Sequence, residues 1–340
     1  FGYLKIRANN ASVTGEKEKQ QIVLSYDKAK EIYDQAKEDT ALGRTSNTDK
    51  FSEAMALAKK AEESNTTKEK AQELIREIQN TLDGATKTKR LYSTDPNLVF
   101  NDKTKKIILA GTDIYGFDSE GKVYSANTQD KEARLVASTG KENGEVASLS
   151  YSPNKNNIFI YTKNGRLLLF DISTKTQSEL NPSEGQWEKA AGIANFVTNL
   201  YLLDKETGQI WKHGETDNTY SKGTAYLNSK NTIVKDGIDI AIDGNIYLLS
   251  ASGNAYKFSR GVIDQSFSLK NTPAPNSKIG EPIKIYTDED VNYIFVLDKE
   301  LNRVLRFDKS GEFTSQYALD NMAVDDFVVN GKVQKLWLMS

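Results

Sequence analysis

The sequence lacks cysteine altogether and contains a single histidine, His213, among its 340 residues. Without cysteine the chain has no disulfide framework, no thiolate metal site and no cysteine nucleophile. With one histidine, a zinc site built on two histidines is excluded, and a serine triad would depend on His213 alone. We therefore predict no catalytic residues, no metal ligands and no cofactor for this chain.

Long apolar runs and an excess of charge of one sign are also missing. No apolar run reaches the ~18 residues that a membrane-spanning helix needs. The 45 basic and 47 acidic residues give a net charge of −2, so no global field attracts nucleic acid, and we predict no nucleic-acid partner. The chain begins at Phe1, and its apolar opening, Phe1 to Ile6, is either the tail of an upstream membrane helix or a frayed end.

Proline, tryptophan and glycine are scarce in the first quarter of the chain. All six prolines lie at or after Pro96, all three tryptophans lie at or after Trp187, and 18 of the 22 glycines follow residue 91. This shift in composition predicts a domain boundary at about residue 90, between a segment 16–90 and a domain 91–340. Residues 1–15 are predicted to be a juxtamembrane or flexible lead-in.

The segment 16–90 shows apolar residues at helical spacing. These residues predict three helices, at about 16–42, 48–64 and 67–83. Each apolar stripe is narrow and rich in alanine, as in Ala54, Leu57 and Ala61. We interpret the segment as a helical hairpin or stalk; a peptide-binding module of the tetratricopeptide type is the alternative, although three helices are too few for a stacked array.

The domain 91–340 is built on one repeated pattern: a polar residue, an aliphatic, an aromatic, any residue, a large apolar residue and a small polar residue. The copies begin 42 to 48 residues apart, at Asp113, Asn157, Asn199, Asn245, Tyr293 and Lys335. The first five copies run through a turn with glycine or asparagine into a second strand, which is typical of a tight β-hairpin. Four strands in a unit of about 45 residues predict a blade of a β-propeller. The fold class is therefore an all-β six-bladed propeller with an N-terminal α-helical segment.

The sixth copy ends at Ser340 and leaves room for only two strands in the last blade. Residues Leu91 to Asp102 precede the first repeat and belong to no other. We predict that these residues complete blade six, because an open ring would leave an unpaired sheet edge.

When the repeats are aligned, two adjacent positions in the strand after the hairpin turn contain candidate functional residues. His213 falls where other repeats have Phe170, Phe258 and Phe307, so we interpret it as a replaced core aromatic rather than a catalytic base. The preceding position of the aligned repeats is occupied by Lys212, Lys257 and Arg306, and by Ser125 and Leu169 in the other two copies. This basic stripe is a candidate site for a carboxylate or phosphate, although lysines that discourage sheet-to-sheet pairing are the commoner reason for such a column.

Two acidic runs, Asp288 to Asp290 and Asp325 to Asp326, are predicted to lie in solvated turns. They are also candidates for calcium ligation through oxygen, but they lack the alternating ligand spacing and the glycine of a calcium loop. We therefore assign no metal site to them.

The repeat resembles the blades of the NHL, TolB and YVTN-like group of propellers. The likeness rests on a motif of the type Asn-Ile-Tyr-x-Leu-Asp followed by Gly and Val-x-x-Phe, as in Asn245 to Phe258 and Tyr293 to Phe307. That group mostly serves as a recognition platform. More loosely, the helical segment with its propeller looks like the extracytoplasmic tail of a membrane-anchored bacterial phosphatase of the metal-dependent PP2C type. This second resemblance implies an extracytoplasmic chain, attached to a membrane only through a segment upstream of Phe1; a cytoplasmic location is the alternative.

The predicted function is a non-catalytic sensor or docking module that binds a protein, peptide or glycan ligand. An enzyme of the lactonase or lyase type, with a metal or polar site at the central channel, is one alternative, and a structural scaffold is another. The repeated residues account for the ring itself, so they do not identify the ligand.

Overall fold

The computed structural model describes residues 2–42, 47–92, 98–138, 140–217, 219–229, 231–273, 276–332 and 334–340, with side chains described from Gln20 onward. The chain divides into two compact units. The first comprises Phe1–Lys89 with Pro273–Ser277, and the second comprises Arg90–Thr272 with Lys278–Ser340.

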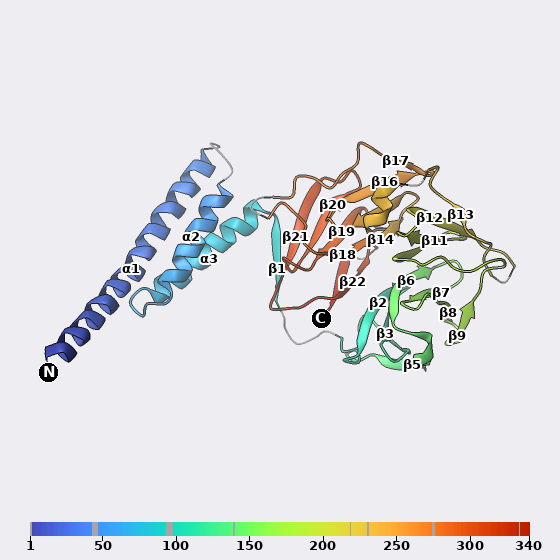
Figure 1. The fold of residues 1–340 in the computed structure, drawn as a ribbon, viewed down its shortest axis with the longest axis horizontal. Coiled ribbons are helices and arrows are strands. Elements are labelled where there is room, and N and C mark those ends of the chain that lie inside the picture. The colour runs from blue at the N-terminus through green and yellow to red at the C-terminus, as the bar shows by residue number, and fades with distance from the viewer. Residues whose placement is uncertain are drawn as a thin grey trace. The chain divides into compact units, whose positions relative to one another are not determined.

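The first unit contains three α-helices, α1(Gly2–Ala41), α2(Thr48–Ala61) and α3(Lys68–Ala85) (Figure 1). The predicted lead-in of residues 1–15 is wrong in one respect, because α1 already begins at Gly2. No proline interrupts this stretch, so the backbone hydrogen bonds of the helix can continue back to its first residues.

The helices of the first unit pack through small side chains. Helix α2 contacts both α1 and α3. Tyr33 packs against Phe51 with ring centroids 5.9 Å apart, and its hydroxyl lies 3.1 Å from the Thr81 hydroxyl. Six alanines of this unit are completely buried: Ala29, Ala36, Ala54, Ala58, Ala61 and Ala71. Because alanine presents only a methyl group, the helix backbones approach closely and bury little apolar area per residue.

The second unit is an all-β propeller, as the repeats predicted, and Figure 1 shows its sheets arranged around a centre. Blade one consists of β2(Thr104–Ala110), β3(Asp113–Asp118), β4(Lys122–Asn127) and β5(Arg134–Ser138). Blade two consists of β6(Val146–Ser152), β7(Asn157–Thr162), β8(Leu167–Asp171) and β9(Thr176–Leu180). Blade three consists of β10(Gly192–Phe196), β11(Asn199–Asp204), β12(Gln209–Gly214) and β13(Thr224–Ala225).

Blades four and five continue the same order. Blade four consists of β14(Gly237–Ile242), β15(Ile246–Ser250), β16(Ala255–Ser259) and β17(Val262–Ile263). Blade five consists of β18(Pro282–Tyr286), β19(Tyr293–Asp298), β20(Arg303–Asp308) and β21(Phe313–Asp320), with β1(Thr88–Tyr92) as a fifth strand beside β21. The sixth repeat forms a two-stranded sheet of β22(Asp326–Asn330) and β23(Lys335–Met339). Short 3₁₀ helices lie at Lys141–Asn143 and Thr232–Asp236.

The inner strands of the six repeats follow one another around the ring. Each of β2, β6, β10, β14 and β18 neighbours the inner strand of the next repeat, and β22 neighbours β2. The ring therefore has five full blades, and the two-stranded sheet of the sixth repeat closes it.

The predicted completion of blade six by Leu91–Asp102 is wrong for the described residues of that segment, none of which pairs with β22 or β23. Leu91 and Tyr92 end strand β1, which pairs with β21 of blade five. Val99 forms a parallel bridge with Glu132, next to blade one, while residues 93–97 of the proposed segment lie outside the described residues. A salt bridge accompanies the pairing of β1 with β21: a terminal nitrogen of Arg90 contacts the two carboxylate oxygens of Asp320 at 2.8 and 3.0 Å.

Described side chains of the segment before the first repeat take part in the closure of the ring. Leu98 and Phe100 pack against an apolar cluster of Ile107, Ile114 and Val328, which joins blade one to the sixth repeat. The Phe100 ring lies so close to the backbone at residue 116 that a Cβ atom there would be 2.5 Å from it, which explains the glycine at this position. Apolar packing therefore contributes to the closure of the ring.

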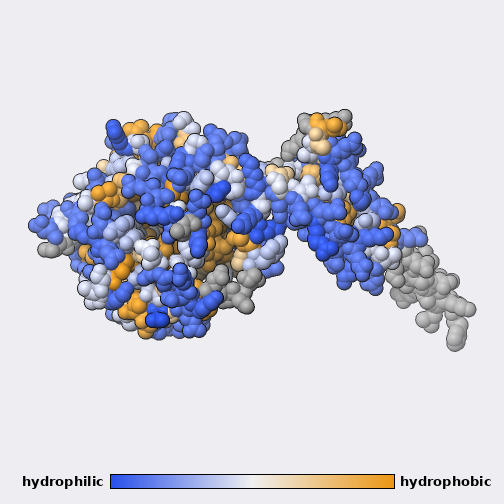
Figure 2. Space-filling view, turned by 180° about the vertical axis from the view of Figure 1, so that it is seen from behind, coloured by the Kyte–Doolittle hydropathy of each residue, from blue (hydrophilic) through white to orange (hydrophobic). Residues whose placement is uncertain are grey.

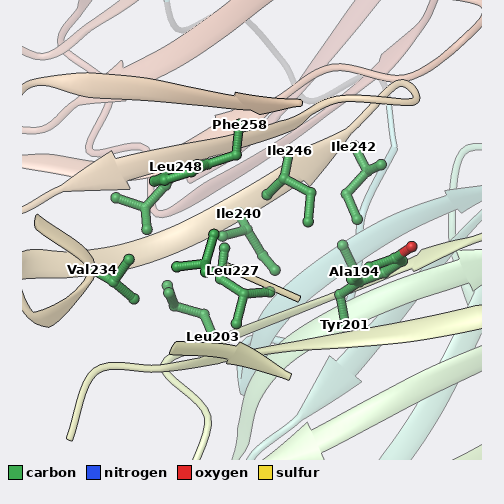
Figure 3. Close-up of a cluster of buried hydrophobic side chains, with 11 residues drawn as sticks. Ala194, Tyr201, Leu203, Leu227, Val234, Ile240, Ile242, Ile246, Leu248 and Phe258 are labelled. Carbon is green, nitrogen blue, oxygen red and sulfur yellow. The ribbon is translucent and has the colours of Figure 1, made fainter. Parts of the chain in front are cut away.

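Large apolar side chains fill the space between neighbouring blades. Figure 3 shows the cluster between blades three and four, in which Leu203 of β11 faces Ile240, Leu248 and Phe258 of blade four. Phe258 is 1 % exposed. Full burial of such a side chain contributes about 1.5–3 kcal/mol, so each blade depends on its neighbours for its stability.

Candidate functional site

A cavity of about 660 Å³ runs along the inner strands of the propeller, and residues of β2, β6, β10, β14, β18 and β22 all line it. This volume lies within the range of small-molecule sites, about 300–1,000 Å³. The cavity is the central channel of the ring, so residues of every blade reach it.

One residue from each inner strand occupies the same level of the ring, and all of them except the glycine of blade three line the cavity. In each repeat, this residue pairs with the fifth residue of the second-strand motif, for example Lys106 with Phe117 and Asp326 with Met339. The six residues, which we call the channel belt, are Lys106, Ser148, Gly192, Asp239, Lys284 and Asp326. The backbone register shifts next to Lys106, Ser148, Asp239 and Lys284. Such bulges redirect side chains.

The belt residues of blades two, four and six hold the next blade by its backbone. Ser148 Oγ accepts a hydrogen bond from Ile193 N at 3.1 Å. Asp239 Oδ2 accepts one from Ile285 N at 3.0 Å, and Asp326 Oδ2 accepts one from Ile107 N at 2.9 Å. These three side chains therefore have a structural role in addition to lining the channel.

Lys284 and Asp326 form an ion pair within the belt. Lys284 Nζ lies 2.5 Å from Asp326 Oδ1 and donates to the Phe327 carbonyl at 2.7 Å. Asp326 Oδ1 also accepts from Phe327 N at 2.8 Å. Because Asp326 is 1 % exposed, its charge needs these donors to offset the loss of hydration. The pair stabilises the junction of blades five, six and one.

Lys106 and Asp239 are the two belt charges that are not in such a pair. The Lys106 ammonium makes no ion pair or hydrogen bond with the residues that the structure describes. Burial raises the pKa of Asp239 from 3.8 to about 6, whereas the Ile285 N–H and the charges of Lys284 and Lys106 act in the opposite direction. Asp239 is partly buried and lines the channel. With a pKa of about 6, the Asp239 carboxyl group is mainly ionised at neutral pH.

Because Gly192 has no side chain, the Asp239 side chain can pack directly against its backbone. A Cβ atom on Gly192 would lie 3.1 Å from Asp239 Oδ1 and 3.3 Å from Asp239 Cα. The glycine of blade three thus permits the close approach of the blade-four carboxylate.

The opposite end of the channel is formed by the turns that follow the inner strands. Tyr286 donates its hydroxyl proton to Asp288 Oδ2 at 2.7 Å, and burial together with the nearby Asp288 raises the pKa of Tyr286 well above 10. Lys332 pairs with Asp290 at 3.2 Å, and both side chains are more than half exposed. The charges at this end are already paired or solvated, so the belt is the stronger candidate site.

The predicted basic stripe of Lys212, Lys257 and Arg306 lies in the third strands of blades three, four and five, outside the residues that line the channel. Lys257 Nζ lies 5.8 Å from the ring centre of Tyr247, and the Arg306 guanidinium lies 4.4 Å from that of Tyr293. These cation–π contacts give two of the three residues a structural role. A binding role for the stripe stays a prediction.

His213 is buried in blade three, opposite Leu200, in the register where Phe258 pairs with Ile246. Its Nε2 lies 2.9 Å from Glu188 Oε2, and its Nδ1 lies 2.9 Å from the Ser221 carbonyl. Both ring nitrogens are thus engaged in a fully buried position, as expected for a replaced core aromatic.

The acidic runs have different environments. Asp325 is exposed and pairs with Lys299 at 2.7 Å. The prediction that Asp326 also lies in a solvated turn is wrong, because Asp326 begins β22 and is buried in the belt. Among the described residues, no group of three or more His, Cys, Asp or Glu side chains is placed to hold a metal ion. No helix in the same part of the chain is long and apolar enough to cross a membrane.

The exposed apolar residues are scattered. The large ones among the described residues of the propeller are Tyr92, Val99, Leu135, Val197 and Val262. The face shown in Figure 2 is mostly hydrophilic, with small separate apolar areas. Single exposed apolar residues are normal on protein surfaces, so they do not indicate a docking surface.

Sequence reasoning did not single out Lys106, Ser148, Asp239 or Lys284. A signal was present for two of them: Asp239 lies between Ile238 and Ile240, and Lys284 lies between Ile283 and Ile285. A charged residue between two isoleucines of an inner strand indicates a polar environment on one side of that strand. Only the ring shows that this side is the channel.

Comparison with known proteins identifies no family for this chain. No protein-family model matches the chain, and no curated protein matches it. Solved structures that resemble it include PorZ, a bacterial surface component of the type-IX secretion system of Porphyromonas gingivalis, with 16% identity and a TM-score of 0.44. That match covers 69% of this chain and 35% of PorZ, so the chain spans about a third of the length of that protein.

Two further solved structures have similar scores. A chain of a nidogen–laminin complex has 11% identity and a TM-score of 0.47, with 69% of this chain and 82% of that chain covered. The WD40 β-propeller domain of Doa1 has 9% identity and a TM-score of 0.45, with 69% and 75% covered. The resemblance to the NHL group and to the phosphatase tail therefore stays a prediction.

Proposed function

We propose that this chain is a non-catalytic binding module that takes its ligand in the central channel of the propeller. The supporting observation is the channel belt, in which Lys106 and Asp239 line the cavity while Lys284 and Asp326 neutralise each other. Charged groups in such a cavity are incompletely hydrated, so a ligand with complementary groups gains more from them than from a surface site.

Three candidate catalytic side chains among the described residues are held in structural contacts, which supports a binding role over catalysis. His213, the one histidine of the sequence, is fully buried, and both its nitrogens have hydrogen-bond partners. The belt carboxylate of Asp326 is committed to Ile107 N and Lys284. Ser148 Oγ accepts from Ile193 N, and no histidine lines the cavity with it.

A ligand screen with a blocked-channel variant tests the proposal. The intact chain is screened by thermal unfolding against small peptides, amino acids, sugars and organic acids, and hits are measured by calorimetry. A ligand at 100 times its Kd stabilises a protein by about 2.7 kcal/mol. We expect Lys106→Trp, which fills the belt level, to abolish binding, and Lys105→Trp, at the adjacent exposed position, to preserve it.

Two outcomes would overturn this proposal. One is that no compound stabilises the chain, or that every hit binds the Lys106→Trp variant equally well. The other is hydrolase or lyase turnover by the purified chain, particularly with a retained metal ion.

The biological setting that we propose is a ligand-sensing part of a larger, membrane-anchored bacterial protein located outside the cytoplasm. The helical unit would then be a spacer or transmitter between the anchor and the propeller. Protease accessibility in intact source cells tests this location: cleavage from outside supports it, and protection until the cells are lysed contradicts it.

A further inference from the structure

The two belt charges without an ion-pair partner come from opposite sides of the ring. Lys106 belongs to blade one and Asp239 to blade four, so three steps around the ring separate them in either direction. The other two charges, Lys284 and Asp326, belong to adjacent blades and contact each other. At the level of the belt, the channel therefore presents one cation and one anion without an ion-pair partner, on opposite sides of the ring.

This arrangement selects for a particular distribution of charge in a ligand. A simple anion would be attracted by the Lys106 ammonium but repelled by the Asp239 carboxylate. A simple cation would be attracted by Asp239 but repelled by Lys106. A molecule with a carboxylate at one end and an ammonium at the other satisfies both groups at once. The backbone N–H groups of Ile285 and Ile240 donate to the Asp239 carboxylate, and its remaining lone pairs can accept from an ammonium donor in the cavity.

We infer that the channel belt binds a small zwitterion with separated charges, such as an ω-amino acid or a short peptide, with its carboxylate on Lys106 and its ammonium on Asp239. This inference rests on the proposed function, because it assigns a ligand class to the same channel. The balance of charge is the reason that a zwitterion fits better than a sugar, which would leave both belt charges without a counter-ion.

A series of ω-amino acids tests the inference on the intact 340-residue chain. The probes run from 4-aminobutanoate to 8-aminooctanoate, so that one of them matches the span of the channel. Hexanoate and hexylamine are the comparison compounds with a single charge. Affinity is measured by calorimetry and ligand-detected NMR at low ionic strength, where salt does not screen the charges.

We expect the best ω-amino acid to bind about tenfold or more tightly than either single-charge compound. Lys106→Met should reduce its affinity to that of hexylamine, and Asp239→Asn should reduce it to that of hexanoate. The matched controls Lys105→Met and Asp217→Asn change the same charges at exposed positions and should leave binding unchanged.

The inference is overturned if no ω-amino acid exceeds the single-charge compounds, or if the two belt variants bind as the wild type does. This failure is distinct from failure of the proposed function. If another compound from the screen binds and Lys106→Trp blocks it, the channel is a binding site and only the ligand class is wrong. If nothing binds in the channel at all, both proposals fail.

Discussion

The helical unit and the propeller obtain their stability in opposite ways. The helical unit packs completely buried alanines such as Ala54 and Ala58, so it depends on the close approach of backbones. The propeller packs large side chains such as Phe258 and Phe307 between blades. The difference teaches that the two units should respond to opposite kinds of core substitution: loss of volume damages the propeller, whereas added volume damages the helices.

The largest expected effect is loss of volume between blades. Phe258→Ala should destabilise the propeller by about 3–5 kcal/mol, because it removes a buried ring and leaves a cavity between blades three and four. Calorimetric unfolding of the intact chain measures this effect. Val262→Ala in the same blade, where the side chain is 56 % exposed, is the control and should change stability little. An equal effect of both substitutions would contradict the assigned core.

Removal of the buried belt carboxylate should have a similar effect for an electrostatic reason. Asp326→Ala leaves the Lys284 charge and the Ile107 N–H without their acceptor, at an expected cost of about 3–5 kcal/mol. The adjacent Asp325→Ala breaks only an exposed pair with Lys299 and should cost about 1 kcal/mol or less. Denaturant unfolding of both variants measures the difference. Equal costs would show that the belt pair does not stabilise ring closure.

The stability of the propeller should also depend on pH, because of a buried carboxyl group in its channel. The pKa of Asp239 is raised from 3.8 to about 6 by burial, so the folded propeller binds a proton more tightly than the unfolded chain does. The stabilisation from this proton is fully present below pH 3.8 and is lost as the pH rises to about 6.

Comparison of the wild type with Asp239→Asn isolates this contribution from the other carboxylates. Relative to the variant, the wild type should lose up to about 3 kcal/mol between pH 4 and pH 7. The charges of Lys284 and Lys106 lower the pKa of Asp239, but burial is the larger effect, so the sign is that of a raised pKa. Denaturant titrations at several pH values measure the difference; a constant difference would contradict the raised pKa.

The smallest expected effect is added volume in the helical unit. Ala58→Leu should destabilise that unit by about 1–3 kcal/mol, because the helices must separate to accommodate the larger side chain. Ala56→Leu, two residues away on the exposed side of α2, makes the same change without burial and should be nearly neutral. Far-UV circular dichroism follows the helices during unfolding. Tolerance of leucine at Ala58 would mean that the helical core is loosely packed.

Much of the propeller was predictable because its information is local and repeated. The second-strand motif and the hairpin turn lie within about 15 residues of each other, and a turn residue such as Gly253 adopts a φ of 85° that favours glycine. The helices were predictable for the same reason, since their periodicity depends on neighbours three or four residues away. The extension of α1 back to Gly2 was missed, because residues 2–15 show no clear apolar periodicity.

The sequence by itself determined that the chain has two regions, that the second contains six related units, and that His213 replaces a core aromatic. Only the tertiary structure decided how the ring closes and which charges meet in its channel. Ile107 and Asp326 are 219 residues apart, and Arg90 and Asp320 are 230 residues apart. Contacts over such separations depend on the position of each blade around the ring, because a strand edge accepts many partners until the surrounding side chains select one.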